Sequence, residues 1–274
     1  MSTVAQADPR QLERRYAEVA RALRDEIIDH YRDRGESLDT PAGRRTLDTN
    51  TTLAAQRGEL LLRLLARCGG PAELRGLRVA DLGCGFGALS LYLATAGADV
   101  TGIDPNVERQ RVGARVAERL RLAATFRRGW LEDLVLPDAA FDIAVLNNSL
   151  CYIVARDERR RALQHTLRIL VPGGWLVMRN PARMAPLDPF TGLPFVHQIS
   201  PHLSARILRR RERPRSTVRL KTAGAASREL RREGFTSVRR QRIDQAWWLP
   251  PRYQHHTARR PVSLPTVAAP PKST

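Results

Sequence analysis

Residues 79–87 read Val-Ala-Asp-Leu-Gly-Cys-Gly-Phe-Gly, an apolar segment that ends near an acidic residue and continues into three alternating glycines. Glycines let the backbone turn tightly and approach a ligand closely, where a Cβ atom would clash. The segment 83–88 also satisfies Gly-x-Gly-x-x-Ala, the fingerprint of dinucleotide-binding domains. This pattern therefore predicts a nucleotide-type ligand at the end of a strand, and it fits two cofactor classes.

Two acidic residues decide between these classes. Asp81 directly precedes the glycine loop, where a dinucleotide would place its pyrophosphate. A carboxylate there would repel phosphate but suits the ammonium group of S-adenosylmethionine (SAM). Asp104 ends the apolar segment 100–104, where a carboxylate can accept hydrogen bonds from both hydroxyls of an unphosphorylated ribose. Asp104 can also cap the helix that begins after Pro105, and the two roles are compatible.

The surrounding chain alternates short apolar segments with helical patterns, which is typical of a parallel α/β sheet. The expected strands are 77–82, 99–104, 125–127, 143–147 and 175–178, and the expected helices are 88–96, 107–120 and 157–170. Right-handed crossovers bring the strand ends together at one sheet edge, where ligands of such sheets bind.

Flanking segments extend this core. Residues 1–70 are predicted to form a helical extension, with one helix at 10–31, turn-rich residues at 35–51 and a second amphipathic helix that ends at Gly69-Gly70-Pro71. The catalytic domain is expected at 71–253, with a proline-rich, lid-like insert at 181–215. Within it, a helix at 225–232 and a strand at 236–243 follow the insert. The tail at 254–274, rich in Pro, Thr and Arg, is expected to be disordered.

Four segments in this order resemble the motifs of class I SAM-dependent methyltransferases. They are VADLGCGFG at 79–87, VTGIDPN at 100–106, FDIAVLNNSLCYI at 141–153 and LRILVPGGWLVM at 167–178. The resemblance implies a Rossmann-like fold: a mostly parallel, seven-stranded sheet with helices on both faces, with SAM as cofactor. The residues expected to contact SAM are Asp81, Gly83, Cys84, Gly85, Gly87, Asp104, Pro105, Trp130, Leu131 and Asn147.

One segment departs from the family pattern. Family members often carry an Asp-Ala pair after the third strand, where this chain has Trp130-Leu131. Trp130 could stack on adenine while the backbone of Leu131 hydrogen-bonds the ring. Alternatively, Trp130 is a rim residue and Glu132 or Asp133 meets the adenine amine.

Further candidates concern the methyl acceptor. Asn147 and Asn148 end the fourth strand, and they orient the substrate, bind the amino-acid part of SAM or cap the strand end. An oxygen or nitrogen acceptor can need a general base. His197 is the first candidate for this catalytic role and also the sort of histidine that is often structural; His202 and Tyr152 follow. Acceptor contacts are also plausible near the helix that enters the core, from Arg44, Arg45, Asn50 and Arg57.

The charge of the chain is strongly positive, with 46 Lys and Arg against 28 Asp and Glu, a net charge of +18. Such an excess indicates an anionic partner, or arginines that are simply solvated. We expect a small-molecule, sugar or lipid-linked acceptor. An alternative is an RNA methyltransferase that binds phosphates, and a further one is docking on an anionic membrane, both through the basic segment Arg206–Arg219. Aromatic residues make up only 5% of the chain, which disfavours single-stranded RNA.

Cysteine use and apolar segments bear on the compartment. Three widely spaced cysteines cannot form a full disulfide framework, and their spacing does not suggest a metal site. No segment approaches the roughly 20 apolar residues that span a bilayer. A cytoplasmic enzyme is therefore expected, at most peripheral to the inner face of a membrane.

Overall fold

The computed structural model describes residues 9–187, 193–195, 197–199, 203, 206, 218–241 and 253–262. Its N-terminal part is helical, with α1 at Pro9–Asp33, α2 at Pro41–Asn50 and α3 at Thr52–Arg67. The prediction of turns at 35–51 was wrong for α2. Thr40 caps this helix by accepting a hydrogen bond from the backbone N–H of Gly43 at 3.0 Å, and Pro41 occupies the first turn, where its missing N–H costs nothing.

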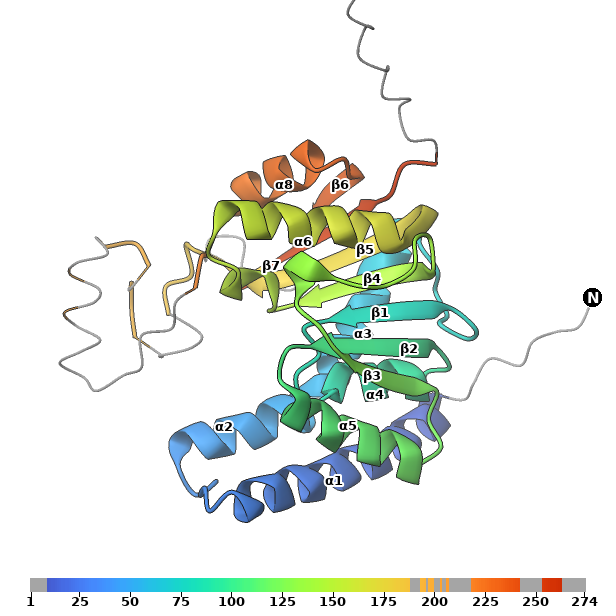
Figure 1. Ribbon diagram of the computed structural model, residues 1–274, viewed down its shortest axis with the longest axis vertical. Helices are drawn as coiled ribbons and strands as arrows, with labels where there is room; N and C mark the ends of the chain where they lie inside the picture. The colour runs from blue at the N-terminus through green and yellow to red at the C-terminus, as the bar shows by residue number, and fades with distance from the viewer. Residues whose placement is uncertain are drawn as a thin grey trace, which may run out of the picture.

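Seven strands form one sheet in the order β3-β2-β1-β4-β5-β7-β6 (Figure 1). β7 runs antiparallel to both β5 and β6, and the pairings from β3 to β5 are parallel. This confirms the predicted mostly parallel, seven-stranded α/β sheet. The strands are β1 Arg78–Leu82, β2 Asp99–Asp104, β3 Ala124–Arg128, β4 Phe141–Asn147, β5 Leu170–Pro181, β6 Thr236–Gln241 and β7 Tyr253–Arg259.

Helices cover both faces of the sheet, as predicted (Figure 1). One face packs against α3 together with α4 at Ala88–Thr95 and α5 at Val107–Arg119. The other face packs against α6 at Arg156–Ile169 and α8 at Ala223–Arg232, with a short 3-10 helix η1 at Leu131–Asp133. A second 3-10 turn, η2 at Leu150–Tyr152, follows β4.

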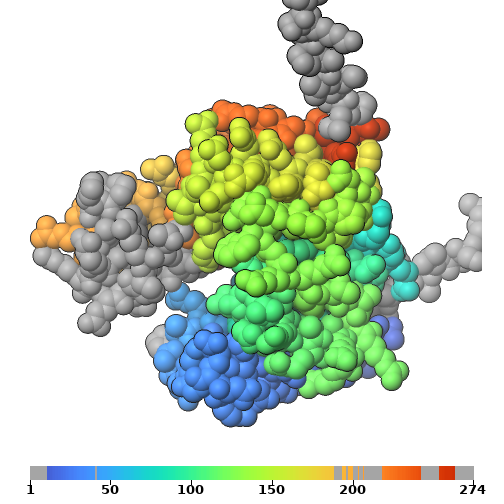
Figure 2. All heavy atoms as spheres, viewed as in Figure 1, coloured from blue at the N-terminus to red at the C-terminus, as the bar shows by residue number. Residues whose placement is uncertain are grey.

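The N-terminal helices share their hydrophobic core with the sheet. Leu23 and Ile27 of α1 and Leu64 and Leu65 of α3 are fully buried in one cluster that also contains Val100 of β2. Figure 2 shows the N-terminal helices in blue, packed directly against the green central elements. Residues 9–67 are therefore part of the same folded unit as the sheet, because each apolar helix face is buried against its neighbours.

The C-terminal boundary differs from the prediction. Residues 253–259 were assigned almost entirely to a disordered tail, yet they form β7, which lies between β5 and β6. Its side chains from Gln254 to Ala258 are buried, although most are polar. His256 on this strand finds partners on α8, with its Nε2 3.1 Å from the carbonyl oxygen of Ala223 and 3.1 Å from Ser227 Oγ. The tail prediction was therefore wrong for these residues, and residues 263–274 lie outside the described part.

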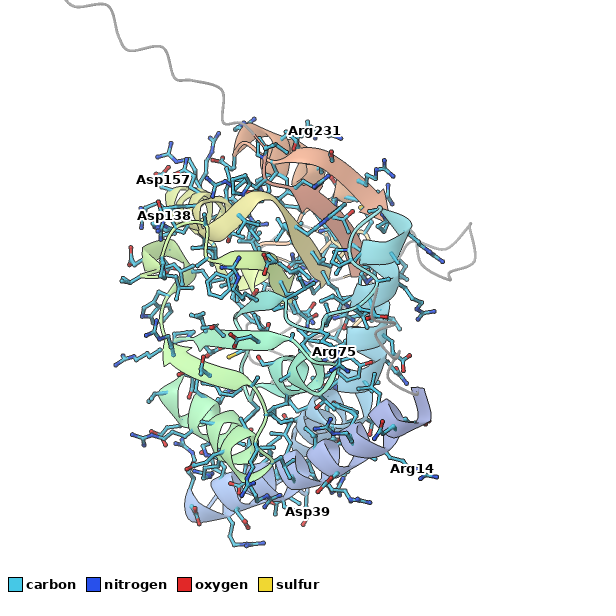
Figure 3. The ribbon with its side chains drawn as sticks, turned by 90° about the vertical axis from the view of Figure 1, so that its right-hand side faces the viewer. Arg14, Asp39, Arg75, Asp138, Asp157 and Arg231 are labelled. Carbon is cyan, nitrogen blue, oxygen red and sulfur yellow. The ribbon has the colours of Figure 1, made fainter. Side chains whose placement is uncertain are left out.

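Charged side chains are spread widely over the surface. In Figure 3, the labelled arginines and aspartates, from Arg14 on α1 to Arg231 on α8, project outward at separated places on the molecule. Of the basic segment proposed to bind RNA or membrane, residues 207–217 lie outside the described residues, while Arg206 is exposed. Among the helices that the structure describes, none is both long and apolar enough to cross a membrane.

Candidate active site

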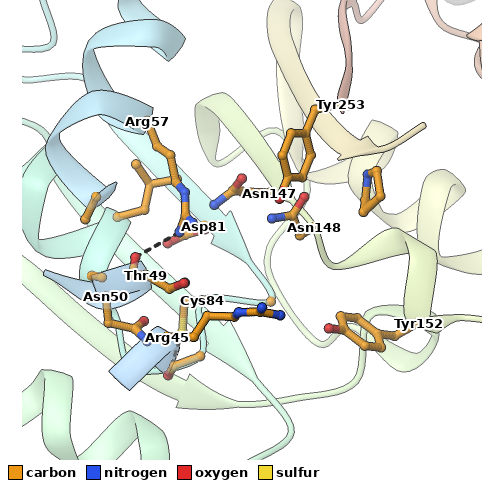
Figure 4. A pocket seen from close by; sticks show the side chains of 16 residues that line it. Arg45, Thr49, Asn50, Arg57, Asp81, Cys84, Asn147, Asn148, Tyr152 and Tyr253 are labelled. Carbon is orange, nitrogen blue, oxygen red and sulfur yellow. Dashed lines mark hydrogen bonds between the residues drawn. The ribbon is translucent and has the colours of Figure 1, made fainter. Parts of the chain in front are cut away.

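A cavity of about 340 Å³ opens at the carboxyl edge of the parallel strands (Figure 4). This volume falls in the range of about 300–1,000 Å³ that is typical of small-molecule sites. Helices α2 and α3, the loop after β1, the end of β4 and the start of β7 all contribute to its wall. The lining residues are Arg45, Thr49, Asn50, Ala54, Arg57, Asp81, Gly83, Cys84, Gly85, Ala88, Leu89, Asn147, Asn148, Tyr152, Pro181 and Tyr253.

The glycine loop between β1 and α4 forms the floor of this cavity. Gly83, Gly85 and Gly87 all have positive φ angles, of 86°, 57° and 78°, which side chains rarely adopt. A Cβ atom on Gly83 would lie 2.3 Å from Ser149 Cβ, whereas a Cβ on Gly85 would meet no atom within 4 Å. The first glycine is therefore required by packing, and the second leaves its backbone open to a ligand.

Asp81 lines the cavity at the end of β1 and is almost completely buried. Burial raises the pKa of its carboxyl group to about 6, although the hydroxyl of Ser90 donates a hydrogen bond to it at 2.6 Å. No cationic side chain of the described residues pairs with it. A buried carboxylate of this kind is stabilised by a ligand that brings a positive charge.

Asp104 holds the glycine loop in place. Its Oδ2 accepts a hydrogen bond from the backbone N–H of Gly85 at 2.9 Å, and its Oδ1 accepts one from the N–H of Asn106 at 2.9 Å. The N-cap of α5 is Asn106, whose Oδ1 accepts from the N–H of Arg109 at 3.0 Å, so the alternative prediction that Asp104 caps this helix was wrong. A carboxylate has about four acceptor positions, so Asp104 retains capacity for ribose hydroxyls beside these two bonds. It adjoins Pro105, which is partly buried.

The segment after β3 lies apart from the cavity. Trp130 is 54% exposed, and the side chain of Leu131 is buried in the core on the α6 side of the sheet. Neither they nor Glu132 and Asp133 are among the lining residues of the described cavity. Contacts of Trp130 or Leu131 with adenine stay predictions.

Asn147 and Asn148 both line the cavity, as their place after β4 predicts. Asn148 adopts a positive φ of 60°, and its backbone N–H donates to the carbonyl oxygen of Arg179 on β5 at 2.7 Å. Its side-chain Oδ1 is buried without a hydrogen-bond partner. This places an unused acceptor among the residues that surround the cavity.

The three candidates for the general base, two histidines and a tyrosine, lie at different places relative to the cavity. Tyr152 lines the cavity and is 55% exposed. His197 is described by the structure but is not among the cavity-lining residues, and its role as a base stays a prediction. His202 lies outside the described residues. Arg45, Asn50 and Arg57 line the cavity, whereas Arg44 does not.

Sequence reasoning missed Arg179 on β5 and Tyr253 and His255 on β7. The guanidinium of Arg179 stacks on the ring of Tyr253, 3.5 Å from its centroid, and Arg179 pairs with His255 in the sheet register. Arg179 and His255 line a second, smaller cavity of about 20 Å³ that shares Arg57, Leu89 and Asn147 with the main one. A signal was present in Met-Arg-Asn-Pro at 178–181, where an arginine interrupts an otherwise apolar strand.

The fold and this edge of the sheet define a class of protein. Parallel strands in the order 3-2-1-4-5, an antiparallel strand inserted beside β5 and a glycine loop anchored by Asp104 form the class I methyltransferase architecture. Independently, residues 79–174 match the sequence profile of a family described as a methyltransferase domain. Residues 79–174 therefore belong to a methyltransferase domain, and the sheet that contains them has the fold of class I, SAM-dependent methyltransferases.

Particular relatives give the same result without specifying a subfamily. Ubiquinone biosynthesis O-methyltransferase of Cereibacter sphaeroides is 36% identical over 119 residues, 42% of this chain and 47% of that protein. Malonyl-[acyl-carrier protein] O-methyltransferase of Pseudescherichia vulneris is 32% identical over 130 residues, 47% of each chain. The chain thus spans less than half the length of these curated relatives. A crystal structure of a SAM-dependent methyltransferase from Mesorhizobium loti superposes with a TM-score of 0.56 at 21% identity, over 72% of this chain and 96% of that one, and supports the fold.

Proposed function

We propose that this protein transfers the methyl group of SAM to an oxygen or nitrogen atom of a small-molecule acceptor. The observation that carries the proposal is the cavity at the carboxyl edge, where the open backbone at Gly85 lies near the buried, cation-free carboxylate of Asp81. Two relatives are O-methyltransferases by name, which favours oxygen as the acceptor atom. A sugar or lipid-linked acceptor is also compatible with this cavity.

The residues present fit SAM. Gly85 lacks the side chain that would occupy ligand space, Asp81 offers a negative charge, and Asp104 offers spare acceptor positions next to the loop. When bound, SAM supplies an activated methyl group on a positively charged sulfur. The protein's task is to hold donor and acceptor in line and to exclude water. Asn147 and Asn148 can orient the acceptor, and of the three predicted candidates for the general base, Tyr152 is the one that lines the described cavity.

Calorimetric titration with SAM, S-adenosylhomocysteine and NAD tests the proposal. We expect SAM and S-adenosylhomocysteine to bind and NAD not to bind. Replacing Asp104 by Ala should weaken SAM binding by about 1.5–3 kcal/mol, the range for hydrogen bonds to a charged group. Binding of NAD alone would contradict the proposal.

A second variant separates two effects of this substitution. Because Asp104 also anchors the loop through the N–H of Gly85, Asp104→Ala removes a structural bond as well as ribose contacts. Asp104→Asn retains one oxygen that can accept from the N–H of Gly85, but it loses the charge and the bond from the N–H of Asn106. If ribose binding matters, Asp104→Asn should still lose affinity at a urea concentration and temperature where its unfolding curve shows that it is fully folded.

A further inference from the structure

Two arginines reach the acceptor side of the site. Arg57 on α3 lines both the main cavity and the small one, and Arg179 on β5 lines the small one. Figure 4 shows Arg57 entering from α3 toward the space between Asp81 and Asn147. Both guanidinium groups are partly buried, and burial lowers the pKa of each.

Neither arginine has an acidic partner among the described residues. Arg57 donates from Nη1 to the carbonyl oxygen of Thr49 at 3.0 Å. Arg179 donates from Nη1 to Asn147 Oδ1 at 3.4 Å, stacks on Tyr253, and keeps a buried Nε without a hydrogen-bond partner. The buried Arg159 of α6 provides the contrast, because its Nε lies 2.8 Å from Glu229 Oε1. An acidic side chain therefore balances the charge of the buried Arg159, whereas Arg57 and Arg179 have no such partner among the described residues.

The neighbourhood of the pair adds no negative charge. His255 is buried beside Arg179, and burial together with the positive charge of Arg179 lowers its pKa to about 4. At neutral pH His255 is therefore uncharged, and its Nε2 has no hydrogen-bond partner. Burial and, to a smaller extent, the like charge of Arg57 lower the pKa of Arg179. A positive charge that is removed from water without a counter-charge is unfavourable, and an anionic ligand would offset this.

The sheet register places Arg179 two strands away from Asp81. Asn147 of β4 is paired with Arg179 of β5, which in turn is paired with His255 of β7. Asp81 lies on β1, two strands from β5. At roughly 4.8 Å between neighbouring strands, β5 is about 10 Å from β1 and lies on the side opposite to the ribose-binding end of β2. An anion at Arg179 would therefore lie on the opposite side of Asn147 from Asp81 and Asp104, where we expect the acceptor.

We propose that the methyl acceptor carries a carboxylate or phosphate group that is bound between Arg57 and Arg179. This inference rests on the proposed methyl transfer and adds the substrate class. Guanidinium groups suit such a role, because they bind carboxylate and phosphate through two parallel hydrogen bonds. The unpartnered Nε of Arg179 can donate to such a group, and so can His255 Nε2 in the tautomer that carries its proton on that atom.

The test is titration of malonate and inorganic phosphate into the protein saturated with S-adenosylhomocysteine, at constant ionic strength in chloride. We expect at least one of these anions to bind saturably to the parent protein. Arg179→Gln and Arg57→Gln should each weaken this binding by about tenfold or more, as loss of a charged hydrogen bond predicts. Arg179→Lys, which retains the charge, should lose less.

Two controls separate the possible failures. Arg232→Gln removes an exposed charge on α8 and should leave anion binding unchanged. Titration with S-adenosylhomocysteine and with methylthioadenosine, which lacks the amino-acid part, shows whether the pair holds the cofactor's carboxylate instead. The inference is overturned if neither anion binds while S-adenosylhomocysteine does, or if the two Gln variants weaken S-adenosylhomocysteine but not methylthioadenosine. Failure of S-adenosylhomocysteine to bind the parent protein would instead contradict the proposed function.

Discussion

At the scale of single residues, the carboxyl group of Asp81 is held in an unfavourable environment. Its pKa is raised from 3.8 to about 6 by burial, so ionisation is harder in the folded than in the unfolded chain. The protonated form therefore stabilises the fold below about pH 4, and this contribution is lost as the pH rises through 6. Asp81→Asn should raise the free energy of unfolding of the ligand-free protein at pH 8 by at most about 3 kcal/mol, and by less as the pH falls toward 4. Urea unfolding at several pH values measures this.

The same substitution should weaken SAM binding, because the ammonium group of SAM would lose its counter-charge. Asp142→Asn is the matched control. The pKa of Asp142 is lowered by its hydrogen bonds with Arg78, so its ionised form stabilises the fold above the unfolded pKa, and its loss should not stabilise the protein at pH 8. An Asp81→Asn protein that is less stable at pH 8 but binds SAM normally would show that Asp81 is a structural residue.

At the scale of elements, α3 carries Arg57 to the cavity and is positioned by close packing against α4. Gly58 of α3 faces Tyr92 of α4, and a Cβ atom on Gly58 would lie 2.0 Å from Tyr92 Cδ1. Tyr92 is buried and packs edge-on against Tyr16, 4.8 Å between ring centroids, so it has little room to move. Gly58→Ala should destabilise the protein by about 1–3 kcal/mol, despite a gain of roughly 1 kcal/mol in helix propensity. Thermal and urea unfolding check this.

Two variants show whether packing is the cause. Gly224→Ala on α8 introduces a Cβ that would only approach Arg228 Nη1 to 3.6 Å, and it should be neutral or stabilising. In a double-mutant cycle, Tyr92→Ala should remove most of the cost of Gly58→Ala. Equal costs of Gly58→Ala with and without Tyr92 would contradict this packing argument.

The features that could be predicted from the sequence are those whose residues lie next to each other in the chain. The glycine loop, Asp81 and Asn147 were identified because strand, turn and acidic residue are adjacent in the chain. β7 was missed because its sequence, Tyr-Gln-His-His-Thr-Ala-Arg, lacks an apolar alternation. Its buried polar groups are satisfied by distant partners, such as His256 by α8. The stacking of Arg179 on Tyr253 likewise depends on the pairing of β5 with β7, and a local sequence pattern cannot indicate such a distant contact.

At the scale of the whole molecule, the cavity depends on chain segments that are far apart in sequence. α2 and α3 supply Arg45 and Arg57, β4 supplies Asn147, and β7 supplies Tyr253. Residues 79–174, which match the methyltransferase profile, supply the glycine loop, Asn147, Asn148 and Tyr152, but not Arg57, Arg179 or Tyr253. Substrate choice is accordingly expected to depend also on residues 41–57, on Arg179 and on β7, which lie outside the matched segment.

Removing β7 tests whether the fold and the cavity depend on this distant segment of the chain. β7 hydrogen-bonds to β5 on one side and to β6 on the other, and it brings Tyr253 under Arg179. A chain that ends at Arg252 would leave β5 as an unpaired edge and β6 without a partner strand, so we expect loss of cooperative unfolding and aggregation. A chain that ends at Val262 retains every contact described for the fold and should unfold like the full chain.

Circular dichroism during urea unfolding, size-exclusion chromatography and S-adenosylhomocysteine titration distinguish the two truncated chains. If the chain ending at Arg252 unfolds cooperatively with an unchanged midpoint, β7 is dispensable for the fold, and its contribution would be limited to the acceptor side of the cavity.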